Sequence, residues 1–91
     1  MSTVVPSLAL LVHPTKREAD EVAGDVMAGA ARRGMEAVRL DRAATHAPAD
    51  TDLVVGIGGD GTLLEAAALA MEDDLPVVGV NLGNVGYLAD I

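Results

Sequence analysis

The feature that most constrains the fold is an apolar segment that runs into a glycine-rich loop and then into a second apolar segment. Residues 53–71 read LVVGIGGDGTLLEAAALAM. A short, β-branched apolar run that stops at glycines predicts a buried strand over 53–57. The apolar residues after the loop predict a buried helix that ends near Met71. A strand, a tight glycine loop and a helix in this order are typical of parallel α/β sheets.

The first forty residues show the same alternation of apolar segments. Residues 7–13 (SLALLVH) are almost continuously apolar, which predicts a strand buried on both faces. Apolar residues then recur every three or four positions over 19–30, as in an amphipathic helix. Thr15 and Glu18 have the spacing of a capping box at its start, and Gly34 is placed to end it.

The other segments complete a single domain. Residues 35–40 and 76–80 predict two more strands, while the small and polar residues 41–51 predict a surface loop. Strands and helices alternate along the chain. We therefore predict one α/β domain over residues 1–91, Rossmann-like, with a mainly parallel sheet and flanking helices.

Two stretches of the chain resemble each other. VVGIGGDGTLL at 54–64 and VVGVNLGNVGYL at 77–88 both pass from Val-Val-Gly into a glycine loop. In a parallel sheet the carboxyl ends of the strands share one edge, and open α/β sheets bind ligands in the crevice at that edge. The two glycine loops are therefore predicted to face one site.

The composition restricts the partners. The net charge is −8, and Tyr87 is the only Phe, Trp or Tyr residue. The negative charge opposes binding to nucleic acid or to an anionic membrane, and aromatic side chains for stacking on bases are scarce. Neither nucleic acid nor a membrane is expected as a partner. The chain has no cysteine and no signal or membrane-spanning segment, so a cytoplasmic location is expected.

The glycine loop satisfies the dinucleotide fingerprint G-x-G-x-x-G through Gly56, Gly58 and Gly61. An NAD-dependent oxidoreductase would also have an acidic residue at the end of the next strand to hold a ribose. Asn81 stands at that place, and the fingerprint follows a complete strand-helix-strand unit instead of opening one. The oxidoreductase interpretation is therefore not favoured.

Asp60 is an unusual residue for a loop suited to anions. Gly58, Gly59 and Gly61 allow positive φ angles and a close approach of phosphate to the backbone, next to the amides of a helix start. Asp60 either caps that helix through its own carboxylate or faces a hydroxyl of the ligand. A serine or threonine would cap equally well without placing charge near phosphate, so the ligand role explains more.

With these motifs in order, the chain resembles the amino-terminal part of the NAD kinase family, whose members transfer the γ-phosphoryl group of ATP to the 2′-hydroxyl of the adenosine ribose of NAD. The resemblance is carried by GGDGTLLEAA and by PVVGVNLGNVGYLAD, and ALLVHPTKREADEVAGDV is similar to the family's opening strand and helix. Lipid kinases of the diacylglycerol type and phosphofructokinases share a GGDGT-like loop. They lack an obvious counterpart of the second motif.

The resemblance implies a role for each matched residue. Asp60 corresponds to the catalytic aspartate. The stretches that approach the nucleotides correspond to Gly58, Gly59, Gly61, Thr62, Asn81, Gly83, Gly86 and Tyr87. Two departures are conservative, because Val85 replaces the usual leucine and Tyr87 the usual phenylalanine.

The resemblance also implies ATP and NAD as substrates, with Mg²⁺ on the triphosphate and no protein ligand for the metal. It implies a fold like the amino-terminal domain of NAD kinases and phosphofructokinases. The family's second Asn-Glu motif and its β-rich carboxyl-terminal domain, which drives oligomerisation, are not in these 91 residues. Full-length homo-oligomers are therefore expected, and this chain alone is either inactive or a non-catalytic nucleotide-binding or association module.

Three polar residues near the loops each have two possible roles on the sequence alone. His13 ends the first predicted strand, and a contact with a backbone carbonyl is expected for it ahead of a place in the ligand crevice. Lys16 is interpreted either as a phosphate contact or as a solvated cation. Glu65, on the helix after the glycine loop, is expected to pair locally.

Overall fold

The computed structural model describes residues 5–41 and 44–82. Their strands and helices are β1 (Ser7–Val12), α1 (Arg17–Arg32), β2 (Glu36–Arg39), β3 (Leu53–Gly58), α2 (Asp60–Glu72) and β4 (Val77–Asn81). Each lies within a few residues of its predicted position, and residues 41 and 44–51 form neither helix nor strand, as predicted for a surface loop. No helix in the described ranges is both long and apolar enough to cross a bilayer.

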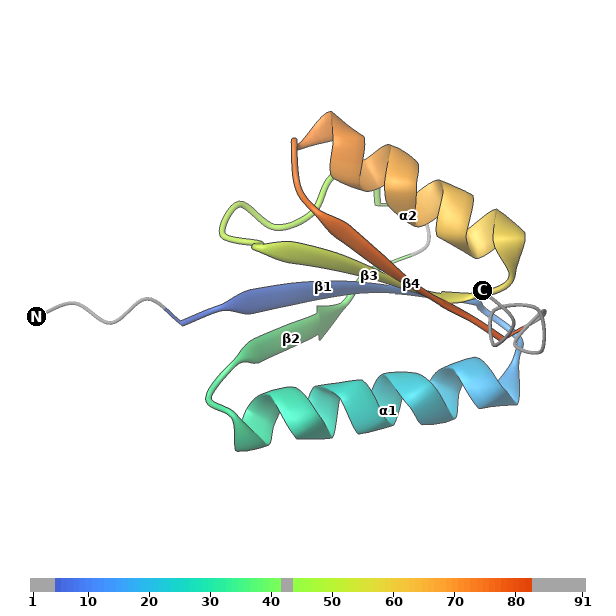
Figure 1. The fold of residues 1–91 in the computed structure, drawn as a ribbon, viewed down its shortest axis with the longest axis horizontal. Helices are drawn as coiled ribbons and strands as arrows, with labels where there is room; N and C mark the ends of the chain where they lie inside the picture. The colour runs from blue at the N-terminus through green and yellow to red at the C-terminus, as the bar shows by residue number, and fades with distance from the viewer. Residues whose placement is uncertain (1–4, 42–43, 83–91) are drawn as a thin grey trace, which may run out of the picture.

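The four strands form one parallel sheet in the order β2-β1-β3-β4. The two helices lie on opposite faces of this sheet, α1 below it and α2 above it in the view of Figure 1. The predicted fold class, a Rossmann-like α/β domain with a mainly parallel sheet, is confirmed.

The α1 face of the sheet contains the larger of the two cores. Leu10 and Val12 of β1 and Ile57 of β3 are buried there against small residues of the helix such as Ala19 and Ala23. Side chains alternate between the faces of a strand, so Leu11 points to the other face and packs beneath α2. The central strand β1 is thus buried on both faces, as its apolar sequence predicts.

The α2 face has a closer contact between helix and sheet. Gly56 of β3 and Gly79 of β4 are register partners on neighbouring strands. A Cβ on Gly56 would lie 2.7 Å from Cβ of Ala66, and one on Gly79 would lie 2.9 Å from Cδ2 of Leu63. The repeated Val-Val-Gly therefore places two glycines side by side, where they leave room for α2.

The prediction that α2 is buried all around is wrong. Leu64 and Met71 are 72% and 80% exposed, while Ala66, Leu69 and Ala70 are buried. The sheet reaches only one side of the helix, so the apolar residues on its other side are left in solvent.

The predicted capping box at the start of α1 is also wrong. The N-cap is Lys16, one residue later than expected, and no side chain caps the helix. The Thr15 amide instead donates to Nδ1 of His13 at 3.2 Å. Thr15 therefore belongs to the turn after β1 and not to the helix.

Both helices end in the same backbone motif. Met35 N donates to Ala30 O at 2.8 Å after α1, and Leu75 N donates to Ala70 O at 2.8 Å after α2. Each motif places one residue at positive φ, Gly34 at 73° and Asp74 at 54°. These bonds define Schellman motifs, so the predicted role of Gly34 is confirmed and Asp74 has the equivalent role in α2.

Candidate functional site

The candidate site lies at the carboxyl edge of the sheet, between β1 and β3. These strands are neighbours, and the chain leaves them toward opposite faces, because α1 follows β1 and α2 follows β3. Such a topological switch point opens a crevice in α/β sheets. A pocket of 250 Å³ is present here, lined by His13, Pro14, Lys16, Gly59, Gly61, Thr62 and Glu65.

Asp60 is the first residue of α2 and is exposed. Its Oδ1 accepts a hydrogen bond of 2.8 Å from Nδ2 of Asn81, the last residue of β4. The backbone closes the same junction, because Leu82 N donates to Gly58 O at 2.8 Å. The two glycine-loop motifs, separated in sequence by a helix and a strand, therefore meet at one place.

The capping role considered for Asp60 is not observed. Gly59 is the N-cap of α2, and no side chain makes a capping hydrogen bond there. Oδ1 is held by Asn81, and no hydrogen bond or ion pair joins Oδ2 to any other described residue. The carboxylate is thus fixed in orientation through one oxygen and presents the other to solvent.

Lack of space, and not a positive φ angle, explains the glycine at position 58. Gly34 is the only described glycine at positive φ, so the expected use of such angles at Gly58, Gly59 and Gly61 is wrong. A Cβ on Gly58 would lie 2.7 Å from Oγ1 of Thr62 and 3.0 Å from Cβ of His13. Around Gly61 no atom lies within 4 Å of that position, so a ligand has free access to the backbone.

Three matched residues, Gly83, Gly86 and Tyr87, lie outside the described residues. Of the second motif, the structure describes residues 76–82, and Asn81 and Leu82 lie at the candidate site.

Two residues of the pocket come from the loop after β1. His13 lines the pocket instead of bonding a carbonyl through its ring, because its Nδ1 accepts from the Thr15 amide. In the neutral imidazole the proton is therefore on Nε2. Lys16 also lines the pocket. Their position directly after a strand at the carboxyl edge was the signal for both, although the sequence left Lys16 open and favoured another role for His13.

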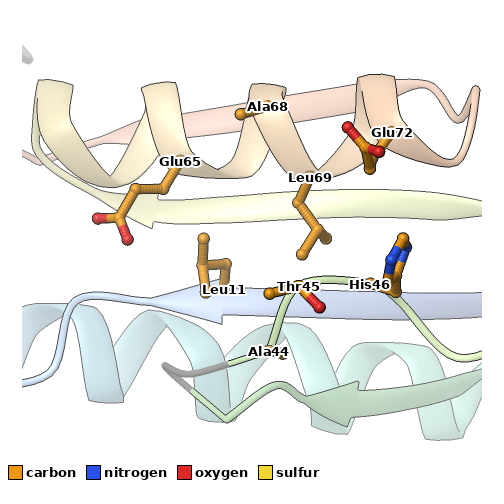
Figure 2. Close-up of a pocket in the computed structure, with 8 residues that line it drawn as sticks. All are labelled: Leu11, Ala44, Thr45, His46, Glu65, Ala68, Leu69 and Glu72. Atoms are coloured by element: carbon orange, nitrogen blue, oxygen red, sulfur yellow. The ribbon is translucent and has the colours of Figure 1, made fainter.

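A second pocket, of 380 Å³, lies between α2, β1 and residues 44–46 and shares Glu65 with the first pocket (Figure 2). Leu11 of β1 and residues 44–46 face Glu65, Leu69 and Glu72 of α2 across it. Its lining is apolar apart from two carboxylates, Thr45 and His46, so it is unsuited to a phosphate group.

The end of α2 is joined to the loop beside this second pocket. Oδ2 of Asp73 accepts a 3.0 Å hydrogen bond from the Ala47 amide, and Oδ1 lies 3.1 Å from Nδ1 of His46. The Ala47 bond, followed by the contact with His46, lowers the pKa of the Asp73 carboxyl. This latch is a structural contact between α2 and the loop.

Comparisons with known proteins agree with the two motifs. The model of the ATP-NAD kinase N-terminal domain matches residues 38–91, more than half of the chain. The chain belongs to the NAD kinase family. The matched range includes β3, α2 and β4, so it contains Asp60 and Asn81.

Curated members of the NAD kinase family are similar over different lengths. NAD kinase 1 of Streptomyces avermitilis is 35% identical over 96% of this chain, which corresponds to 27% of that protein. NAD kinase of Corynebacterium diphtheriae is 57% identical over 50% of the chain and 16% of its own length. NAD kinase of Thermobifida fusca is 48% identical over 62% of the chain. The chain thus spans about a quarter of the length of the Streptomyces avermitilis protein.

Proposed function

We propose that this chain is the amino-terminal nucleotide domain of an NAD kinase, which transfers the γ-phosphoryl group of ATP to the 2′-hydroxyl of the adenosine ribose of NAD and forms NADP. The observation that carries this proposal is the contact between Asp60 and Asn81 at the carboxyl edge. It joins the two family motifs and leaves one carboxylate oxygen available to a substrate.

Asp60 is proposed to act on the acceptor hydroxyl. Its Oδ2 accepts a hydrogen bond from the 2′-hydroxyl and directs the oxygen toward the γ-phosphorus. As the new O–P bond forms, the bond from the γ-phosphorus to the bridging oxygen breaks, ADP leaves, and Oδ2 receives the proton. Phosphoryl transfer has a loose transition state, so orientation of the acceptor is a large part of such a contribution.

The other matched residues are proposed to hold the nucleotides. Gly58, Gly59, Gly61 and Thr62 form the phosphate side, where Gly61 is open and the amides of the first turn of α2 favour anions. Asn81, with Gly83, Gly86 and Tyr87, forms the side toward the dinucleotide. Asn81 supports this assignment because it already contacts the proposed catalytic carboxylate.

The remaining expectations concern the metal and the assembly. Mg²⁺ is proposed to arrive on the ATP phosphates and to neutralise their charge, as in other phosphoryl transfers. We further propose a cytoplasmic enzyme that is a homo-oligomer at full length.

The test is NADP formation by the full-length protein with Asp60→Asn. We expect kcat to fall at least about a hundredfold, as for loss of a general base, while the fold is retained. Asp25→Asn, the same change on the exposed side of α1, is the control and should keep full activity. Activity of Asp60→Asn near that of the control would contradict the catalytic role.

A further inference from the structure

Lys16 lies opposite Asp60 across the loop between β3 and α2. Its Nζ is 3.8 Å from the position of a Cβ on Gly59, and the side chain is half-buried in the lining of the 250 Å³ pocket. Asp60 instead contacts Asn81, on the β4 side of the loop. A cation and a carboxylate thus flank the two sides of one glycine turn.

The Lys16 side chain brings an ammonium group to the lining of the pocket. It forms no ion pair or hydrogen bond with any residue in the described ranges. The chain has only six lysines and arginines against fourteen acidic residues. In so acidic a chain, a half-buried ammonium group without a carboxylate partner among the described residues is available to an anionic ligand.

Thr62 places a second hydrogen-bond donor in the same pocket. The residue is 4% exposed, and it lines the pocket. No buried side-chain nitrogen or oxygen of the described residues lacks a hydrogen-bond partner, so the Thr62 hydroxyl is not an unsatisfied buried group but a donor at the pocket wall. A phosphate oxygen is an acceptor for both a hydroxyl and an ammonium group, and such charge-assisted bonds are strong.

Glu65 also lines this pocket, and its carboxylate has an interaction of its own. The polar side chains that line the pocket beside Lys16 are therefore those of His13, Thr62 and Glu65. The neutral form of the His13 imidazole carries its proton on Nε2.

We propose that Lys16 is the residue that binds the terminal phosphates of the phosphoryl donor, with the Thr62 hydroxyl as a second donor. The role rests on the proposed kinase function and deepens it. The donor then lies on the β1 side of Gly59 and the acceptor on the β4 side, beside Asp60. Lys16 is specific for a chain of phosphates and not for the adenosine, so ATP and inorganic polyphosphate share this contact.

The test is calorimetric titration of the chain with tripolyphosphate and with ATP. Lys16→Gln is expected to weaken both affinities about tenfold or more, as for loss of a hydrogen bond to a charged group. Lys16→Arg should retain most of the affinity. Arg33→Gln, the same change of charge at the opposite end of α1, should alter it little. Circular dichroism checks that the variants keep the fold.

The outcomes separate this inference from the proposed function. Equal affinities of Lys16→Gln and wild type would overturn the inference, and so would an equal loss in Arg33→Gln, which would reflect net charge alone. A loss for ATP but not for tripolyphosphate would place Lys16 at the adenosine and also overturn it. If the full-length Lys16→Gln variant formed NADP with the same KM for the phosphoryl donor as wild type, the role of Lys16 would be refuted and the kinase function would stand. Phosphate binding that depends on Lys16, without any NADP formation, would refute the kinase function alone.

Discussion

The sheet consists of two β-α-β units with the same topology and different construction. In the first, α1 packs on β1 through small and branched side chains, and its start carries a cation, Lys16. In the second, α2 lies close to the sheet over Gly56 and Gly79, and its start carries a carboxylate, Asp60. The shared topology brings both helix starts to one edge, and the different residues give each start its own chemistry.

The close packing of the second unit has a functional consequence. A helix that lies directly on the sheet has its first residue near the end of the neighbouring strand. Here this brings Asp60 within a 2.8 Å hydrogen bond of Asn81. Side chains at positions 56 and 79 would lift the helix and separate this pair. The glycines therefore stabilise the site without touching a ligand.

The largest effect is expected for Gly56→Ala. Its Cβ would lie 2.7 Å from Cβ of Ala66, so the free energy of unfolding should fall by about 1–3 kcal/mol, as in other overpacked cores. In the first unit, Gly24 of α1 has no atom within 4 Å of the equivalent position, so Gly24→Ala should raise it by about 0.5–1 kcal/mol.

Urea denaturation measures both changes. Adding Ala66→Gly to Gly56→Ala should recover part of the loss, because the colliding methyl group is removed. If Gly56→Ala were as stable as Gly24→Ala, the close packing of α2 would be contradicted.

A smaller effect is expected where the two helices end. Gly34 and Asp74 occupy the same position of a Schellman motif, at φ 73° and 54°. Glycine adopts this backbone more easily than aspartate. Asp74→Gly should therefore raise the free energy of unfolding by about 0.5 kcal/mol, and Gly34→Asp should lower it by about 1 kcal/mol. Shifts of the same sign in thermal denaturation would show that the two ends are not equivalent.

The smallest effect concerns the latch that only the second unit has. The pKa of the Asp73 carboxyl is lowered by the Ala47 amide and by His46. A lowered pKa in the folded state stabilises the protein above the usual range for aspartate, and this contribution is lost as the pH falls through the lowered value. Asp73→Asn should thus be less stable than wild type at pH 7, by an amount that decreases on acidification.

The control for the latch is Glu72→Gln, the same change of charge one residue earlier. Between pH 7 and pH 3, the difference in unfolding free energy between wild type and Asp73→Asn should decrease. The difference between wild type and Glu72→Gln should not decrease in this way. A difference for Asp73→Asn that stays constant over this range would contradict the assigned cause.

The fold was predictable because β1, β3 and β4 are compact, mostly apolar runs and a helix follows both β1 and β3. The meeting of the two glycine loops also followed from the sequence, since parallel strands share one edge. The paired role of Gly56 and Gly79 did not, because it depends on the register of β3 against β4. The exposure of Leu64 and Met71 was missed for a similar reason: composition does not show how far the sheet reaches beneath a helix.

The candidate site was predictable in its residues and less so in its geometry. Asp60 stood out as a charge among glycines, but its hydrogen bond to Asn81 requires the tertiary fold. His13 and Lys16 were ambiguous, because a strand end and a helix start carry polar residues in most proteins. Only the position of β1 beside β3 shows that both side chains line the same pocket as Thr62.

The central claim is that the carboxyl edge of the sheet binds nucleotides on two sides of Gly59. The most direct measurement is a map of backbone amide shifts of the chain during separate titrations with ATP and NAD. We predict that ATP shifts the amides of His13, Thr15, Lys16 and residues 59–62, and that NAD shifts those of Asp60 and Asn81. Shifts confined to the pocket beside residues 44–46, or to the amino edge of the sheet, would contradict the account.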